Sequence, residues 1–241
     1  MIQKPLKIVL VKIVLGLAGL LAACGCGNPV QETAAHKIAD ALPSALGPAT
    51  HYDVQVDGDP LALSRGRARA VHLQGRDVQL SPLLTLDTLD ADVRDVSFDP
   101  KTRRLNHVGG TTFRATLSQA NLDRYLAQFK PRLPGLTITL LPDRVGAQVP
   151  VSFFGVRTVA ALSGTLSPNP DDPQKLDFRT RGAQVGSLPL PTGLANLAVS
   201  TLNPVVSLSG LPAPLTITEA HVVGSRLALL GTADLAGLVP H

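Results

Sequence analysis

Four aspartates that lie close together, Asp87, Asp90, Asp92 and Asp95, are of a type that could hold a metal ion or move a proton. Their spacing fits neither chemistry, because alternation along a strand distributes them over both of its faces. The central glycine and closing glutamate of a calcium-binding loop are also missing. We therefore predict solvent-exposed strand positions and no metal site.

Nucleophile and phosphate-binding motifs are missing as well. The six histidines have no paired spacing, and the sequence lacks H-E-x-x-H, G-x-S-x-G and G-x-x-x-x-G-K-S/T. Because a catalytic triad can be assembled from distant parts of a chain, a hydrolase stays an alternative. The prediction is a protein that is not an enzyme and needs no cofactor.

Three arginines, Arg65, Arg67 and Arg69, alternate in the sequence, so that a strand would present all three on one face. A planar guanidinium can pair with two phosphate oxygens at once. The three side chains therefore fit either a solvated strand face or a surface that contacts an anionic lipid headgroup or a membrane.

The N-terminal segment has the pattern of an export signal. Lys4, Lys7 and Lys12 precede an apolar run that ends in Leu21-Ala22-Ala23-Cys24. This ending resembles the bacterial lipobox, in which the cysteine is lipidated and becomes the new N-terminus. We predict a lipoprotein signal peptide over 1–23 and a tether over 24–30. The protein would be exported and anchored by lipidated Cys24 on the periplasmic side of the cell envelope. An uncleaved membrane anchor and plain secretion are the alternatives.

Charge and composition limit the classes of partner that the protein could bind. Three of the 22 basic residues lie in the predicted signal, which leaves 19 against 18 acidic residues, so we predict no nucleic-acid binding. Cys24 and Cys26 are the only cysteines and lie too close together to form a disulfide framework. Six Phe, two Tyr and no Trp leave a mainly aliphatic interior. Such an interior suits hydrocarbon chains, and it equally suits an ordinary core.

The clearest element is a helix that follows Ser118, a residue suited to the N-cap. Leu122, Tyr125, Leu126 and Phe129 form one apolar stripe along it. In one interpretation this stripe is plain core. In the other it lines a lipid groove together with apolar residues of the following strands, namely Ile138, Leu140, Val149, Phe153 and Phe154. The adjacent Phe153 and Phe154 could instead form a tip that touches a membrane.

The long strand expected over Leu84–Phe98 changes the parity of its apolar positions twice. Slips of this kind predict bulges that bend a strand. With further helices expected near 34–42 and 192–202, the fold class is α+β. We expect a long, curved antiparallel sheet wrapped around a few short helices, in a single domain over 31–238.

The order of these elements resembles the LmeA-like phospholipid-binding family. The resemblance rests on Ala115-Thr116-Leu117-Ser118 before Asn121-Leu122, on the strands Leu136–Leu140 and Arg144–Val151, on Gly164-Thr165-Leu166, and on Leu188-Pro189-Leu190-Pro191. It implies a TULIP-like fold with an apolar groove, phospholipid as the partner and a location in the cell envelope.

The resulting prediction is an envelope lipoprotein that binds or carries phospholipid and supports envelope lipid homeostasis. A scaffold lipoprotein with a closed core is the first alternative, and a hydrolase is the second. The sequence does not indicate which proteins, if any, are partners.

Overall fold

The computed structural model describes residues 29–99, 104–131, 133–153, 156–209 and 215–235. The predicted signal peptide, Cys24 and Phe154 lie outside these residues. Within the described part of the chain, no helix has both the length and the apolar character needed to cross a membrane.

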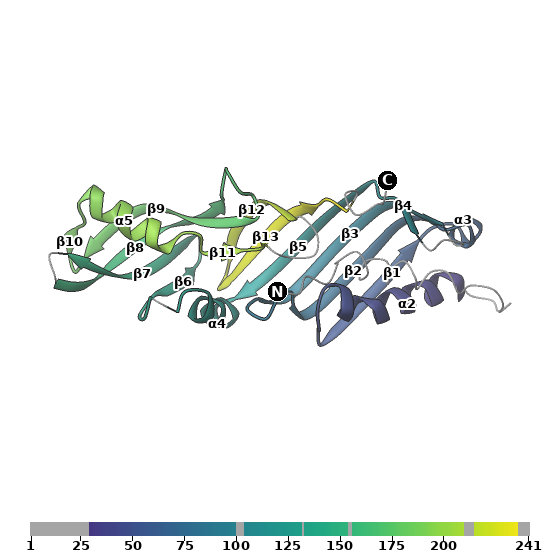
Figure 1. Ribbon diagram of the computed structural model, residues 1–241, viewed down its shortest axis with the longest axis horizontal. Coiled ribbons are helices and arrows are strands. Elements are labelled where there is room, and N and C mark those ends of the chain that lie inside the picture. The colour runs from purple at the N-terminus through teal and green to yellow at the C-terminus, as the bar shows by residue number, and fades with distance from the viewer. Residues whose placement is uncertain (1–28, 100–103, 132, 154–155, 210–214, 236–241) are drawn as a thin grey trace, which may run out of the picture.

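Four helices and thirteen strands form the described structure (Figure 1). The helices are α2 (Pro29–Ala45), α3 (Pro60–Ser64), α4 (Gln119–Phe129) and α5 (Thr192–Leu202). The strands of the first half are β1 (His51–Asp57), β2 (Arg67–Gln79), β3 (Thr85–Asp99), β4 (Arg104–His107) and β5 (Gly110–Ser118). Those of the second half are β6 (Thr137–Leu141), β7 (Arg144–Phe153), β8 (Val156–Pro168), β9 (Lys175–Val185), β10 (Leu188–Pro189), β11 (Val206–Ser207), β12 (Leu215–Val223) and β13 (Arg226–Ala233).

The strands form two antiparallel sheets that follow one another along a long molecule (Figure 1). A seven-stranded sheet has the order β1-β2-β3-β5-β13-β12, with β4 beside β3. A six-stranded sheet has the order β10-β9-β8-β7-β6, with β11 beside β9. The sheets meet where β12 packs on β8, and the Ile217 amide donates to the Pro173 carbonyl at 2.8 Å. The predicted α+β class with curved antiparallel pairing is confirmed, but the strands divide into two sheets.

The parity changes of β3 have a different origin from the predicted bulges. A bulge puts an extra residue into one strand, whereas β2 and β3 keep one register from end to end. Two rungs of this ladder are unpaired, and they contain Asp77 (φ 51°) and Asp95 (φ 52°). Aspartate tolerates this left-handed backbone better than most residues. At each of these two rungs, the core residues of both strands therefore change parity along the sequence.

A continuous hydrophobic core runs through both sheets. The three longer helices cover different parts of it: α2 packs on β1, α5 packs on β7 and β9, and α4 contacts β3, β5 and β6. Because β3 and β5 belong to one sheet and β6 belongs to the other, α4 lies at the junction of the two sheets.

Candidate functional site

The start of α4 is fixed by capping, as the sequence predicts. The Ser118 hydroxyl accepts a hydrogen bond from the Asn121 amide at 3.4 Å. The Ser118 amide donates in turn to the carboxylate of Asp87 on β3. These bonds satisfy amide groups that a helix start otherwise leaves unpaired, and they attach α4 to the seven-stranded sheet.

Gln119 attaches the same turn to the six-stranded sheet. Its Nε2 donates to the Ile138 carbonyl at 2.5 Å, and its Oε1 accepts from the Leu140 amide at 2.8 Å. This amide side chain therefore pairs with the backbone of β6 as a neighbouring strand would. Nothing in the sequence pattern indicates this role, since Gln119 reads as an ordinary polar residue of the first helical turn.

Tyr125 and Lys130 hold the other end of α4. The Tyr125 hydroxyl accepts from the Ser207 amide at 3.0 Å, and its ring stacks on Phe129 with 4.9 Å between centroids. Burial raises the pKa of Tyr125 to about 12, so the hydroxyl stays protonated even near pH 10, where an ordinary tyrosine is half ionised.

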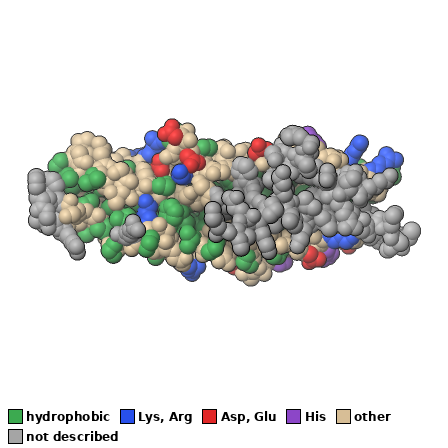
Figure 2. Space-filling view, in the orientation of Figure 1, with side chains coloured by type: hydrophobic (Ala, Val, Ile, Leu, Met, Phe, Trp, Pro, Cys, Tyr) green, Lys and Arg blue, Asp and Glu red, His purple; other side chains and the backbone are tan. Residues whose placement is uncertain are grey.

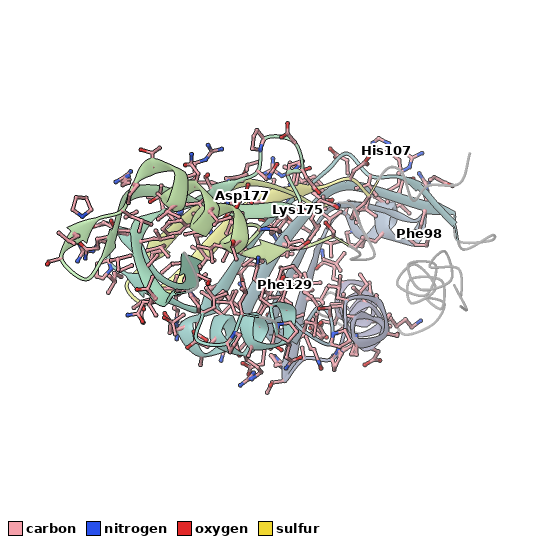
Figure 3. The ribbon with its side chains drawn as sticks, turned by 60° about the vertical axis from the view of Figure 1, so that its left-hand side comes forward. Phe98, His107, Phe129, Lys175 and Asp177 are labelled. Carbon is pink, nitrogen blue, oxygen red and sulfur yellow. The ribbon has the colours of Figure 1, made fainter. Side chains whose placement is uncertain are left out.

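The Lys130 ammonium donates to two carbonyls at the C-terminal end of α5, Thr201 at 3.0 Å and Asn203 at 3.4 Å. Partial burial lowers the pKa of Lys130, and the charge of Asp177 opposes that shift. Figure 3 labels Phe129, at the end of α4, and Asp177, on β9. A lysine is favoured here because the last carbonyls of a helix carry partial negative charge.

A pocket of about 590 Å³ lies between α4 and the segment that leads into β6. Its apolar wall consists of Leu126, Ala127, Pro131, Leu133, Pro134, Leu136 and Ile138. Its polar groups are Gln119, Asp123, Lys130, Thr137 and Thr139. The volume lies within the range of ligand pockets, and a mostly apolar wall with a few polar groups is their usual composition.

The pocket includes only part of the predicted lipid-lining set. Leu126 and Ile138 line it, although they are only 4% and 1% exposed. Four further residues of the set are buried in the core, with 0–4% of their surface exposed, and do not line the pocket, namely Leu122, Tyr125, Leu140 and Val149. Phe129 is half-buried and packs against the core. The Phe153 side chain and the whole of Phe154 lie outside the described residues. Lipid contact by the set stays a prediction.

A family model described as LmeA-like phospholipid-binding matches residues 29–232. The chain belongs to this family. Neither a curated protein nor a solved structure matches the chain. The match begins at the first residue of α2 and ends near the end of β13, so it spans both sheets and the helix at their junction.

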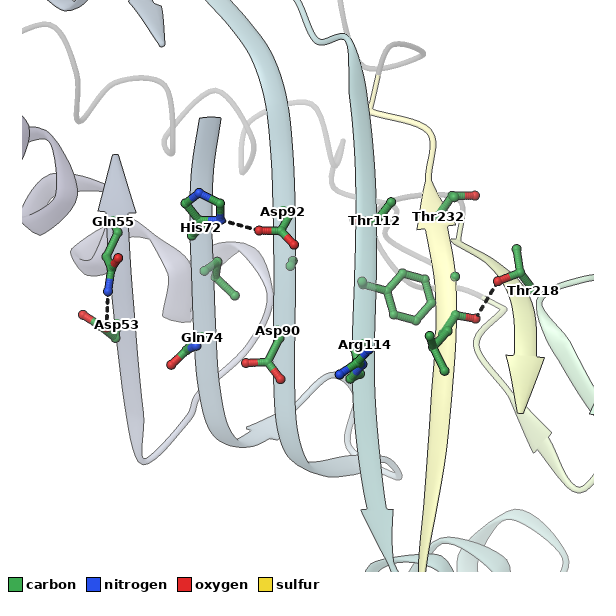
Figure 4. A pocket seen from close by; sticks show the side chains of 15 residues that line it. Asp53, Gln55, His72, Gln74, Asp90, Asp92, Thr112, Arg114, Thr218 and Thr232 are labelled. Atoms are coloured by element: carbon green, nitrogen blue, oxygen red, sulfur yellow. Dashed lines mark hydrogen bonds and ion pairs between the residues drawn. The ribbon is translucent and has the colours of Figure 1, made fainter. Parts of the chain in front are cut away.

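This LmeA-like chain has a second hollow, a polar trough of about 850 Å³ across the seven-stranded sheet (Figure 4). Neighbouring strands contribute side chains in register: His72 pairs with Asp92, and Asp90 lies opposite Arg114. His72 Nδ1 and the Asp92 carboxylate form an ion pair when the ring is protonated. The trough is lined by Asp53, Gln55, His72, Leu73, Gln74, Asp90, Ala91, Asp92, Thr112, Phe113, Arg114, Thr218, Leu230, Gly231 and Thr232.

The four aspartates of β3 are dispersed, as their spacing predicts. Asp90 and Asp92 line the trough, and the Asp87 carboxylate accepts a hydrogen bond from the Ser118 amide. Asp95 is exposed and has a positive φ. The first three are half-buried rather than fully exposed. Within the described residues, no group of three or more His, Cys, Asp or Glu side chains could hold a metal ion.

The predicted arginine strand face is wrong at one position. Arg65 is the C-cap of the short helix α3, so only Arg67 and Arg69 lie on β2. Both are exposed, and Arg69 pairs with Asp57 at 2.6 Å. An exposed pair of this kind contributes little to stability. Contact of these arginines with a headgroup or membrane stays a prediction.

Proposed function

We propose that the protein is an exported envelope lipoprotein, anchored through Cys24, that binds or carries phospholipid without catalysing a reaction. The single observation that carries the proposal is the apolar pocket beside α4 with Lys130 at its edge. Membership of a phospholipid-binding family gives the ligand class. A role in envelope lipid homeostasis belongs to the same proposal.

The pocket has the two properties that a phospholipid needs. Its leucines and prolines take hydrocarbon out of water, and each buried methylene contributes about 0.8 kcal/mol. The Lys130 ammonium has three N–H groups, of which two bond to carbonyls among the described residues. The third can donate to a phosphate oxygen, and a bound phosphate would raise the lowered pKa of Lys130.

The scaffold alternative also has an observation in its favour. Most of the α4 stripe is fully buried, as it would be in a closed core that holds no ligand. The two functions differ in whether the pocket beside the stripe is occupied, which a filling substitution can test.

Ala127→Trp should reduce the amount of phospholipid that co-purifies with the protein several-fold, because Ala127 is exposed and lines the pocket. The measurement is native mass spectrometry after mild purification. Ala120→Trp is the matched control, since Ala120 is exposed on the same helix but does not line the pocket. Lipid-free wild-type protein would favour the scaffold, and equal amounts of lipid in both variants would refute this pocket as the binding site.

Cys24→Ser should abolish incorporation of a labelled fatty acid into the protein, because thioether-linked lipid needs the cysteine sulfur. Cys26→Ser should leave incorporation unchanged, since the residues before Cys26 do not form the lipobox pattern. The measurement is metabolic labelling followed by mass analysis of the mature N-terminus. Label that persists in the Cys24→Ser protein would refute the anchor.

A further inference from the structure

The stretch from Gly182 to Thr218 contains no Asp, Glu, Lys, Arg or His, although charged residues make up 17% of the chain. It includes β10, α5 and β11. Soluble surfaces are normally interrupted by charges, so a long uncharged stretch is expected to be buried. The structure shows that part of this stretch is exposed.

The large exposed apolar side chains of the stretch lie in the segment 188–197, which we call the apolar end. Leu188 has 72% of its surface exposed and Leu197 has 50%. On the opposite side of α5, Ala195, Ala198 and Leu202 are buried in the core. The outward side of the helix therefore carries Leu197 among small and uncharged polar residues, and no charged side chain. Exposed leucines on a surface without charges are a feature of contacts with a partner or a membrane.

The apolar end lies at one extremity of the molecule. Figure 1 shows β10 and the start of α5 at the end of the long axis opposite α3. In the view of Figure 2, the coloured side chains closest to this end are hydrophobic or uncharged, and the visible charges lie further along the molecule. Val159, 48% exposed on β8, adds an apolar side chain to the same sheet.

The charges nearest to the apolar end in the sequence are basic. Arg179 and Arg181 are exposed on β9, the strand that pairs with β10. The acidic residues of this part of the chain, Asp171, Asp172 and Asp177, precede them at the beginning of β9 and in the loop before it. Apolar side chains followed by arginines match the depth profile of an anionic bilayer, with hydrocarbon inside and phosphate at the surface.

We propose that the apolar end inserts its leucines into the surface of an anionic phospholipid bilayer while Arg179 and Arg181 contact the phosphates. The contact is independent of the predicted anchor. Gln31 in the first turns of α2 donates to the Gly58 carbonyl at 2.9 Å, next to α3, so α2 begins near the extremity opposite the apolar end. The inference rests on the proposed function for the identity of the partner, since a lipid binder must meet a bilayer to load.

The absence of tryptophan from the sequence allows a site-specific test. Leu188→Trp and Leu197→Trp place one fluorophore each in the apolar end of the full chain. The protein is held by its own anchor in phosphatidylcholine vesicles, and phosphatidylglycerol vesicles with brominated acyl chains are added. A parallel sample carries the brominated lipid in the holding vesicles. Val223→Trp is the control, because Val223 is 60% exposed on β12 outside the apolar end.

We expect both apolar-end tryptophans to lose most of their emission to bromine and to shift to shorter wavelength in at least one arrangement. The Val223→Trp emission should change little. Arg179→Gln with Arg181→Gln should weaken the quenching and its dependence on salt. Water-like, unquenched emission in both arrangements would overturn the proposal and leave a protein partner as the occupant.

The membrane contact and the lipid pocket can each be refuted without refuting the other. Co-purifying phospholipid without quenching would refute the membrane contact and retain the lipid pocket. Quenching by a protein that holds no phospholipid would retain the membrane contact and refute the lipid pocket.

Discussion

The Leu122→Ala variant should lose about 3–5 kcal/mol of the free energy of unfolding. Leu122 is 0% exposed and lies on α4 at the junction of the two sheets. Truncation removes three buried carbon atoms and leaves a cavity, because α4 is attached at both ends and cannot move inward to fill the space. Urea denaturation of the full chain, followed by circular dichroism, measures the loss.

Leu197→Ala is the matched control for this substitution. It makes the same chemical change in another eleven-residue helix, but at a half-exposed position, so its effect should stay within about 0.5 kcal/mol. A loss of less than about 1 kcal/mol for Leu122→Ala would mean that the stripe packs loosely. The stripe would then be the wall of a groove, as the lipid-lining interpretation of the sequence supposes.

The helix α4 could be predicted because its determinants are local. The N-cap, the spacing of four apolar residues and the Lys130-Pro131 stop all lie within one short segment. The sequence does not indicate which side of the stripe lines the pocket. That depends on Gln119, which holds β6, and on Lys130, which holds α5, and both bonds join residues far apart in the sequence.

A local signal was available for α3. Asp59 accepts from the Leu61 and Ala62 amides at 2.8 and 3.1 Å, and Pro60 occupies the first helical position. An aspartate followed by proline is a typical helix start, but a five-residue helix has no apolar period to accompany it. The predicted arginine face needs a strand that already includes Arg65, whereas α3 occupies the residues before Arg65 and β2 begins only at Arg67.

The division into two sheets depends on pairings that a single sequence does not reveal. Alternation predicts strands, and parity changes predict curvature, but neither identifies which strands lie side by side. The last two strands return to the seven-stranded sheet, where β13 pairs with β5 across more than a hundred residues of chain. The trough follows from that pairing, because its lining comes from β1, β2, β3, β5, β13 and β12, and it has no sequence motif of its own.

Gly164→Ala should cost about 3 kcal/mol or more, because its β-carbon would overlap the backbone of the neighbouring strand. A β-carbon at Gly164 would lie 2.1 Å from the Arg179 carbonyl oxygen and 2.9 Å from the Phe178 ring. The β8–β9 register shifts between Ser163 and Gly164. The glycine lets β9 approach closely at this shift, beyond which β9 pairs with β10 at the apolar end.

The matched control lies on the adjacent strand of the same sheet. Gly146 on β7 pairs with Ser163, and a β-carbon there would come no closer than 3.9 Å to another residue. Gly146→Ala should therefore be neutral or stabilise by up to about 1 kcal/mol, because glycine loses more backbone freedom on folding than alanine does. For a domain of this size, thermal melting should separate the variants by about 6–12 °C. Equal melting temperatures would show that β9 can move away from β8 at little cost, and the position of the apolar end would then not depend on this contact.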